Sequence, residues 1–191
     1  MKTSQKITFL LLLLPIICYG QNLSYTTNRI GLTVAGLDYS IEKQINMNKS
    51  LIFSAELVYD FFRKRGISGD ESGWGLSPLL YVEPRWYYNF IKRQRDKKKV
   101  VFNSSNYLGM YVGYRFWPIV NKNLSNEGNF FLVPNIGFQR TVGKRVTVDP
   151  KFGYSFLFNG AGVYSNSLFI DLKISLILLN SKQKKYFKFN P

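Results

Sequence analysis

Charged side chains in this chain recur between apolar ones, at spacings that put acids and bases on one face of an extended strand. From Leu168 to Leu178 every even-numbered residue is aliphatic, whereas Asp171 and Lys173 stand at odd positions. A carboxylate beside an ammonium group can form an ion pair, pass a proton or line an ion path. Eight residues share this arrangement in the predicted strands: Glu56, Asp60, Glu83, Arg85, Arg115, Lys151, Asp171 and Lys173.

These eight charges have two interpretations. If the strands close into a narrow barrel, the interior is just wide enough for side chains to fill it, and an unpaired charge there is costly. We therefore expect a structural network of ion pairs that plugs the lumen. The alternative is a proton or ion path, or an acid and base pair that takes part in a reaction.

Other kinds of chemistry lack the residues that they need. The chain has no histidine, which is the commonest general base and metal ligand, and Cys18 is its one cysteine. The sequence contains no glycine-rich phosphate loop and no metal-ligand cluster. We therefore predict no catalytic, cofactor or metal site, and a protein that is not an enzyme.

The elements that carry the charges are predicted to be β-strands, because apolar residues recur at every second position and not at the period of about 3.6 residues of a helix. Six such segments follow Leu51. Residues 21–45 supply the remaining strands, but their alternation changes phase at Ala35 and Gly36. A tight turn there gives two short strands and eight in all, whereas a bulge there would leave one long strand.

The polar segments between strands are predicted to be connections. If the strands form an eight-stranded outer-membrane barrel with both chain ends in the periplasm, three loops lie outside the cell: Arg63 to Leu76, Pro118 to Gly128 and Asn159 to Tyr164. The basic stretch from Lys92 to Asn106 then lies in the periplasm, where turns are usually shorter.

The N-terminal residues have the pattern of an export signal. Lys2 and Lys6 precede the apolar run Phe9 to Ile17, which is too short to span a membrane as a helix, and small residues near Gly20 suit a signal peptidase. We predict a cleaved signal peptide at residues 1–20 and one domain at residues 21–191. Since no run is long enough for a transmembrane helix, the predicted fold is all-β, an antiparallel up-and-down transmembrane β-barrel of eight strands.

The chain is strongly basic. It carries 26 Lys and Arg against 11 Asp and Glu, a formal charge of +15 at pH 7. An exported barrel rarely meets nucleic acid, so we expect none as a partner and favour phosphates of membrane lipid headgroups or lipopolysaccharide. Arg63, Lys64 and Arg65, beside the aromatic Phe61 and Phe62, are the predicted contact, and solvated loops are the alternative.

Two stretches carry a resemblance to a known group of proteins. They are YVEPRWYYNF at residues 81–90 and NSSNYL at residues 103–108. They resemble small Gram-negative outer-membrane β-barrel proteins, whose architecture is that of the OmpA and OmpX kind. The resemblance implies the fold and an outer-membrane location, and it implies no particular activity.

The sequence thus predicts a monomeric, non-enzymatic, porin-like protein of the cell envelope, with a plugged polar lumen and a structural or surface-interaction role. One alternative is a soluble lipocalin-like barrel that binds a small apolar ligand, in which the apolar face points inward. Another is a barrel that anchors a secretion or assembly machinery. The sequence identifies no protein partner.

Overall fold

The computed structural model describes residues 26–66, 69–123, 128–159 and 162–178, with the side chains of residues 62–71, 159 and 162–164 outside the description. The predicted signal peptide at residues 1–20 therefore lies outside the described residues.

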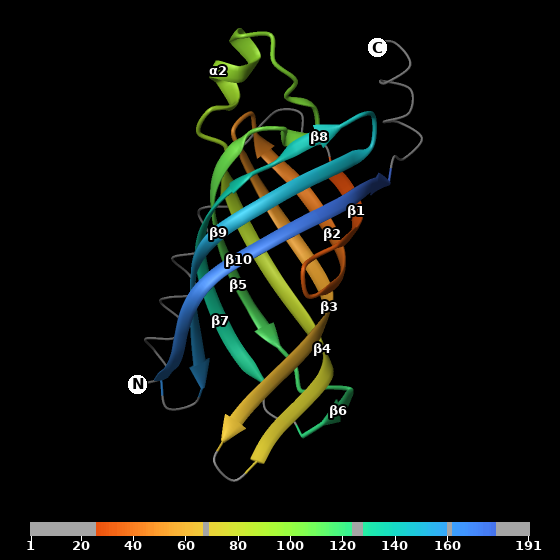
Figure 1. Cartoon of the computed structure of the whole chain (residues 1–191). Coiled ribbons are helices and arrows are strands. Elements are labelled where there is room, and N and C mark those ends of the chain that lie inside the picture. The colour runs from red at the N-terminus through yellow and green to blue at the C-terminus, as the bar shows by residue number, and fades with distance from the viewer. Residues whose placement is uncertain (1–25, 67–68, 124–127, 160–161, 179–191) are drawn as a thin grey trace, which may run out of the picture.

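The fold is an antiparallel β-sheet in which hydrogen bonds close a ring through eight strands (Figure 1). The ring strands are β1 (Thr26–Leu32), β2 (Gly36–Asn46), β3 (Lys49–Gly66), β4 (Gly69–Trp86), β5 (Asn106–Arg115), β7 (Asn129–Phe138), β9 (Val146–Asn159) and β10 (Gly162–Leu178). The ring closes because β10 pairs with β9 on one side and with β1 on the other, with Ile174 opposite Leu32. The prediction of an all-β antiparallel fold is confirmed, and so is the number of eight strands in the ring.

Four short elements lie off the ring. Strand β6 (Val120–Lys122) pairs with β4, and β8 (Arg140–Val142) pairs with β9. Helix α2 (Phe90–Arg95) and the 3-10 turn η2 (Val101–Asn103) lie between β4 and β5. No helix in the described part of the chain has the length and apolar character that a membrane crossing would need.

The phase change at Ala35 and Gly36 marks a tight turn and not a bulge. Residues 33–35 connect β1 to β2, and the Thr33 N–H donates to the Gly36 carbonyl at 2.9 Å. A Cβ at Gly36 would overlap the carbonyl oxygen of Leu57 on β3, so the close approach of the two backbones requires glycine here.

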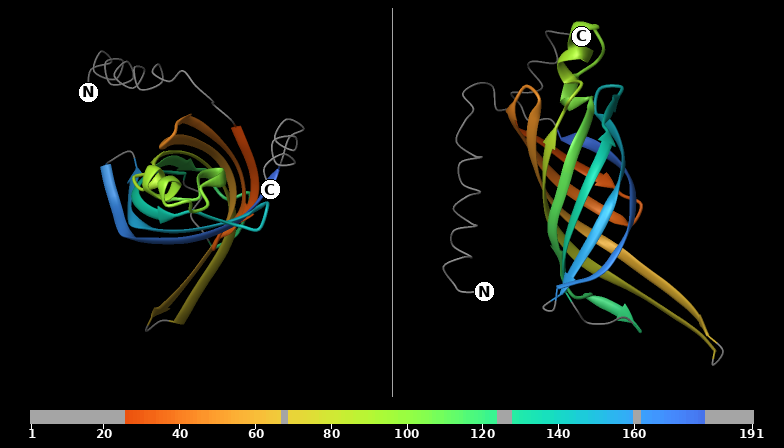
Figure 2. Two further views of the ribbon diagram at one scale, coloured as in Figure 1. Left: turned by 90° about the horizontal axis from the view of Figure 1, so that it is seen from above. Right: turned by 90° about the vertical axis from the view of Figure 1, so that its left-hand side faces the viewer.

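The predicted loop from Arg63 to Leu76 is wrong. Strands β3 and β4 continue their pairing through this segment until Gly66 faces Gly69, and the hairpin projects beyond the rest of the ring (Figure 2). Backbone hydrogen bonds alone extend a two-stranded ribbon, so this stretch does not need the apolar alternation by which a strand is recognised in sequence. The other two predicted loops are also shorter than expected, because β6 lies in one of them and β9 and β10 extend into the other.

Apolar side chains lie on the outside of the ring and polar ones on the inside. On β2, Leu37, Tyr39 and Ile41 are exposed, whereas the intervening Asp38 and Glu42 are each 2% exposed. The other ring strands follow this alternation over most of their length. The inside-out arrangement follows from the period of two residues and determines which side chains share the interior.

Candidate functional site in the ring interior

Arg85, near the end of β4 that leads to α2, is the most highly connected base described in the interior. Its guanidinium group donates to Glu83 at 2.6 Å, to Asp149 at 2.8 Å and to the side-chain oxygen of Gln139 at 2.7 Å. It also lies over the ring of Tyr107, 3.9 Å from the centroid. All these side chains are buried, so the charge of Arg85 is balanced by fixed partners and not by water.

Lys151 extends this network toward β10. Its ammonium group lies 3.8 Å from a carboxylate oxygen of Asp149 and 3.6 Å from one of Asp171, and it donates to the hydroxyl of Tyr111. The residue is completely buried. A second pair, Lys173 with Asp38, lies across the closure of the ring.

A third group lies near the end of the ring where α2 is found. Arg29 pairs with Glu42, which also accepts hydrogen bonds from Ser50 at 2.6 Å, Tyr87 at 2.7 Å and the Asn103 amide at 2.6 Å. Four donors from separate parts of the chain converge on this one carboxylate, so it connects the wall of the ring to the segment that follows α2.

That segment closes one end of the ring. Viewed from above, α2 lies over the ring opening (Figure 2). Phe102 is 3% exposed, and its carbonyl accepts hydrogen bonds from Gln139 at 2.5 Å and Arg29 at 3.4 Å. Phe102 and Asn103 both have left-handed backbones, with φ of 53° and 59°. Such conformations are uncommon for residues other than glycine and here turn the chain back into the interior. We call residues 101–105 the plug segment.

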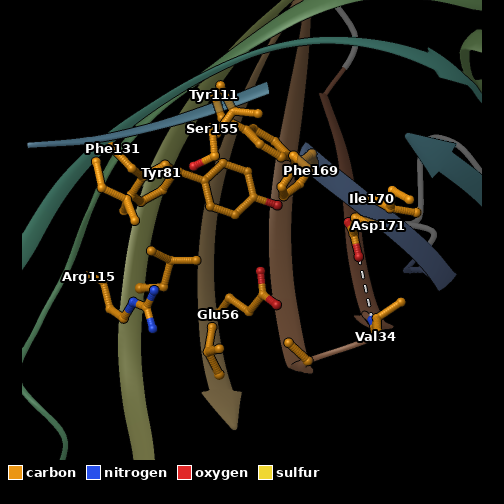
Figure 3. A pocket seen from close by; sticks show the side chains of 15 residues that line it. Val34, Glu56, Tyr81, Tyr111, Arg115, Phe131, Ser155, Phe169, Ile170 and Asp171 are labelled. Carbon is orange, nitrogen blue, oxygen red and sulfur yellow. Dashed lines mark hydrogen bonds between the residues drawn. The ribbon is translucent and has the colours of Figure 1, made fainter. Parts of the chain in front are cut away.

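The opposite end of the interior is open and less polar. A cavity of about 240 Å³ lies there, and its inner wall is a cluster of buried apolar side chains, Tyr81, Tyr111, Phe131 and Val133 (Figure 3). The Tyr81 hydroxyl reaches the charged layer, where it donates to Asp38 at 3.2 Å. Tyr81 therefore contacts both the cavity and the charged layer, and Asp171, the partner of Lys151, lines the cavity directly.

Charged groups also line this cavity. Arg115 pairs with Asp60, and their side chains are 32% and 21% exposed, more than those of the ion pairs deeper in the ring. Glu56 accepts a hydrogen bond from the Thr33 hydroxyl. Among the described residues, no base forms an ion pair with Glu56.

The structure thus brings the eight predicted charged residues to the interior face. Seven of them have an ion-pair partner among the described residues, and Glu56 is the exception. Four further members were not predicted: Arg29, Asp38, Glu42 and Asp149. The alternation of β2 contained the signal for two of them, since Asp38 and Glu42 alternate with the apolar Leu37, Tyr39 and Ile41. Arg63, Lys64 and Arg65 belong to β3, but their side chains lie outside the described residues.

The side chains of the interior are arranged as packed ion pairs and not as a reactive group. Within the described residues no group of three or more His, Cys, Asp or Glu is placed to hold a metal ion. Most of the interior carboxylates are held by Arg or Lys, which leaves them poorly placed to exchange protons with a substrate.

Comparisons with protein-family models, with curated proteins and with solved structures give no match to this chain. Its function is therefore argued from the arrangement of its own residues.

Proposed function

We propose that the chain is an outer-membrane β-barrel protein without enzymatic activity, whose lumen is closed by ion pairs and by the plug segment. The observation that carries this proposal is that apolar side chains cover the outside of the ring and charged side chains fill its inside. Large apolar residues such as Leu168 and Ile170 are 72% and 60% exposed, whereas Glu83 and Lys151 are completely buried. A protein in water reverses this arrangement, and a barrel in lipid requires it.

The spacing of exposed aromatic residues supports a membrane span. Trp74 and Trp86 lie twelve residues apart on β4. At about 3.3 Å per residue and a tilt of about 45°, they are separated by roughly 28 Å along the barrel axis, close to the apolar band of about 25 Å in such barrels. Tyr88 extends the belt near Trp86, and Tyr59 stacks with Trp74 at the other level, with centroids 6.4 Å apart. Aromatic residues at two levels suit the two interfaces of a bilayer.

The distribution of charge supports an orientation. The ring begins at Thr26 and ends at Leu178 on the side of α2, which would face the periplasm if both chain ends are periplasmic. Exposed bases gather at this end: Lys43, Lys49, Lys92, Arg95, Lys97, Lys98, Lys99, Lys144 and Arg145. We propose that this basic end contacts lipid phosphates of the periplasmic leaflet, where each base contributes on the order of 1 kcal/mol.

The soluble lipocalin-like alternative needs the opposite sidedness, because its apolar residues would line the interior. The charged interior and the exposed aliphatic face of β10 both count against it. A role as anchor of a larger assembly remains the second candidate, and the observation that favours it is the β3–β4 hairpin, which projects beyond the ring as a surface for a partner (Figure 2).

Membrane fractionation tests the proposal. The full chain is expressed in a Gram-negative host, and the envelope is washed with high salt and separated on a density gradient. We expect the protein in the outer-membrane fraction, with slower migration on a gel after boiling than before. Recovery of folded protein in the soluble fraction would contradict the proposal.

A further inference from the structure

The wall of the ring is incomplete on one side. Strand β1 pairs with β10 only from Ile174 to Leu178, and β2 pairs with β3 only from Lys49 to Val58. Beyond the β1–β2 turn, the described pairings of β10 from Gly162 to Lys173 are with β9 alone. The edges of β3 and β10 therefore face each other across a lateral gap, which is in front in Figure 1.

The cavity at the open end of the interior lies beside this gap. Its lining includes Val34 and Ala35 from the β1–β2 turn, and Phe169 and Ile170 from the edge strand β10 (Figure 3). A bare strand edge is not tolerated against lipid, but it is tolerated where water in a cavity can satisfy its free N–H and C=O groups. The cavity thus opens sideways as well as along the ring axis.

The outward side of the gap's rim is apolar, whereas on its inner side the Asp171 carboxylate accepts a hydrogen bond from the Val34 N–H at 3.5 Å. Val34, at the tip of the turn, is 74% exposed, and the neighbouring Leu32 and Leu37 are also exposed. A turn that ends in water or among headgroups is normally polar. The exposed aliphatic row of β10 also continues past the last pair with β1, through Leu172 and Ile170. Both features indicate that the gap begins at the depth of the lipid chains.

The interior of the cavity is graded from apolar to polar. Its deep wall is formed by Tyr81, Tyr111 and Phe131, and its charged lining residues are Glu56, Asp171 and Arg115, of which Arg115 belongs to the partly exposed pair with Asp60. An amphiphile with its chain inward and its polar group near Arg115 matches this gradient. The volume of about 240 Å³ is below the roughly 300–1,000 Å³ of pockets for drug-sized ligands, which suits part of one hydrocarbon chain.

We propose that this cavity binds one hydrocarbon chain of a membrane amphiphile, which enters from the bilayer through the gap between β3 and β10. The inference rests on the proposed membrane location and adds a ligand site to it. Arg85 and its partners Glu83 and Asp149 do not line the cavity, so the site does not need that part of the network to open.

Photochemical labelling of the full chain in bilayers tests this site. The bilayers contain a phospholipid with a diazirine near the end of one acyl chain, and labelled peptides are identified by mass spectrometry. We expect labels on Tyr81, Tyr111 or Phe131, whose side chains are buried from the outside of the ring. A parallel sample contains a diazirine fatty acid added from the aqueous side.

The matched variants are Ser155→Phe, which fills the cavity, and Ser72→Phe, which adds the same group to an exposed position on β4. Interior labelling should fall about tenfold in Ser155→Phe and stay unchanged in Ser72→Phe, because a chain would have to displace the new ring. Should Ser155→Phe fail to fold, Ser155→Leu replaces it in the comparison.

Labels confined to exterior residues such as Leu168 and Leu172, in protein that is inserted and folded, would overturn the inference and leave the proposed membrane location standing. Interior labelling by the free fatty acid alone would overturn the lateral route. Failure to insert in the bilayer would instead contradict the proposed function.

Discussion

The guanidinium group of Arg85 lies 3.9 Å from the centre of the Tyr107 ring, and both side chains are buried inside the ring of strands. The ring can reach this place because Gly137 stands opposite it, and a Cβ at that position would overlap the ring. A cation over an aromatic face contributes about 2 kcal/mol when both are desolvated. Besides its hydrogen-bond partners, one tyrosine and one glycine on the neighbouring strands β5 and β7 thus help to position Arg85.

The first prediction concerns this packing. Gly137→Ala should destabilise the protein because the new methyl group pushes Tyr107 off Arg85, and Tyr107→Ala should destabilise it by leaving a cavity, at about 3–5 kcal/mol. In the double variant the methyl group has room, because the tyrosine ring is gone. The loss of unfolding free energy in the double variant should therefore be smaller than the sum of the losses in the two single variants. Unfolding by urea in lipid vesicles measures this. Simple additivity would mean that Gly137 serves another purpose.

The second prediction concerns the charge of Glu83. Glu83→Gln removes one partner of Arg85 but keeps the shape of the side chain and leaves Asp149 in place. We expect a loss of resistance to unfolding toward the lower end of the roughly 3–5 kcal/mol that a broken buried pair costs. Asp96→Asn, which breaks the exposed pair with Lys98, is the control and should cost at most about 1 kcal/mol.

Ion conductance in planar bilayers separates a structural network from an ion path. The Glu83→Gln protein should show the same conductance as the unchanged protein. A change in conductance without loss of stability would make the interior a pore.

The interior charges show how far sequence patterns can lead. The two-residue period assigns the facing of Glu83 and Arg85 from the sequence, since their exposed neighbours alternate with them. The partners of these residues come from strands that are distant in the chain, such as Asp149, and alternation contains no information on that pairing. The sequence did not predict the plug segment for the same reason, because Phe102 is held in place by the distant residues Gln139 and Arg29. Its left-handed backbone could not be predicted either, since such a backbone is expected at glycine and not at phenylalanine.

The β3–β4 hairpin was missed for a different reason. A two-stranded ribbon outside the ring has no interior face, so its residues need not alternate between apolar and polar. The segment from Arg63 to Leu76 is rich in glycine and charged residues, and the sequence pattern therefore did not predict a strand there. The lateral gap also escaped prediction. It follows from the unequal lengths of the short β1 and the long β10, which the sequence indicates only through the phase change near Gly36.

The third prediction separates the two basic surfaces. Replacing Arg63, Lys64 and Arg65 by Ser should lower the lipopolysaccharide that remains with the purified protein. Replacing Lys92, Arg95 and Lys98 by Ser should instead lower bound phosphatidylglycerol, because α2 is proposed to face the periplasm. Each base near an anionic surface contributes on the order of 1 kcal/mol, and salt weakens the effect.

Both variants should stay folded, and both losses should shrink at high ionic strength. Equal effects of the two variants on both lipids would contradict the orientation. Protease added to intact cells gives an independent measurement, since the hairpin should be accessible and α2 protected.

The most direct test of the membrane proposal compares Leu172→Arg with Val142→Arg. Both residues are exposed, Leu172 at 42% in the middle of β10 and Val142 at 57% beside the basic end. In a barrel, arginine near the bilayer midplane costs roughly 2–4 kcal/mol and near the interface roughly 0–1 kcal/mol. The folded fraction in lipid vesicles should therefore fall strongly for Leu172→Arg and little for Val142→Arg. Equal tolerance of both changes would contradict a lipid-facing exterior.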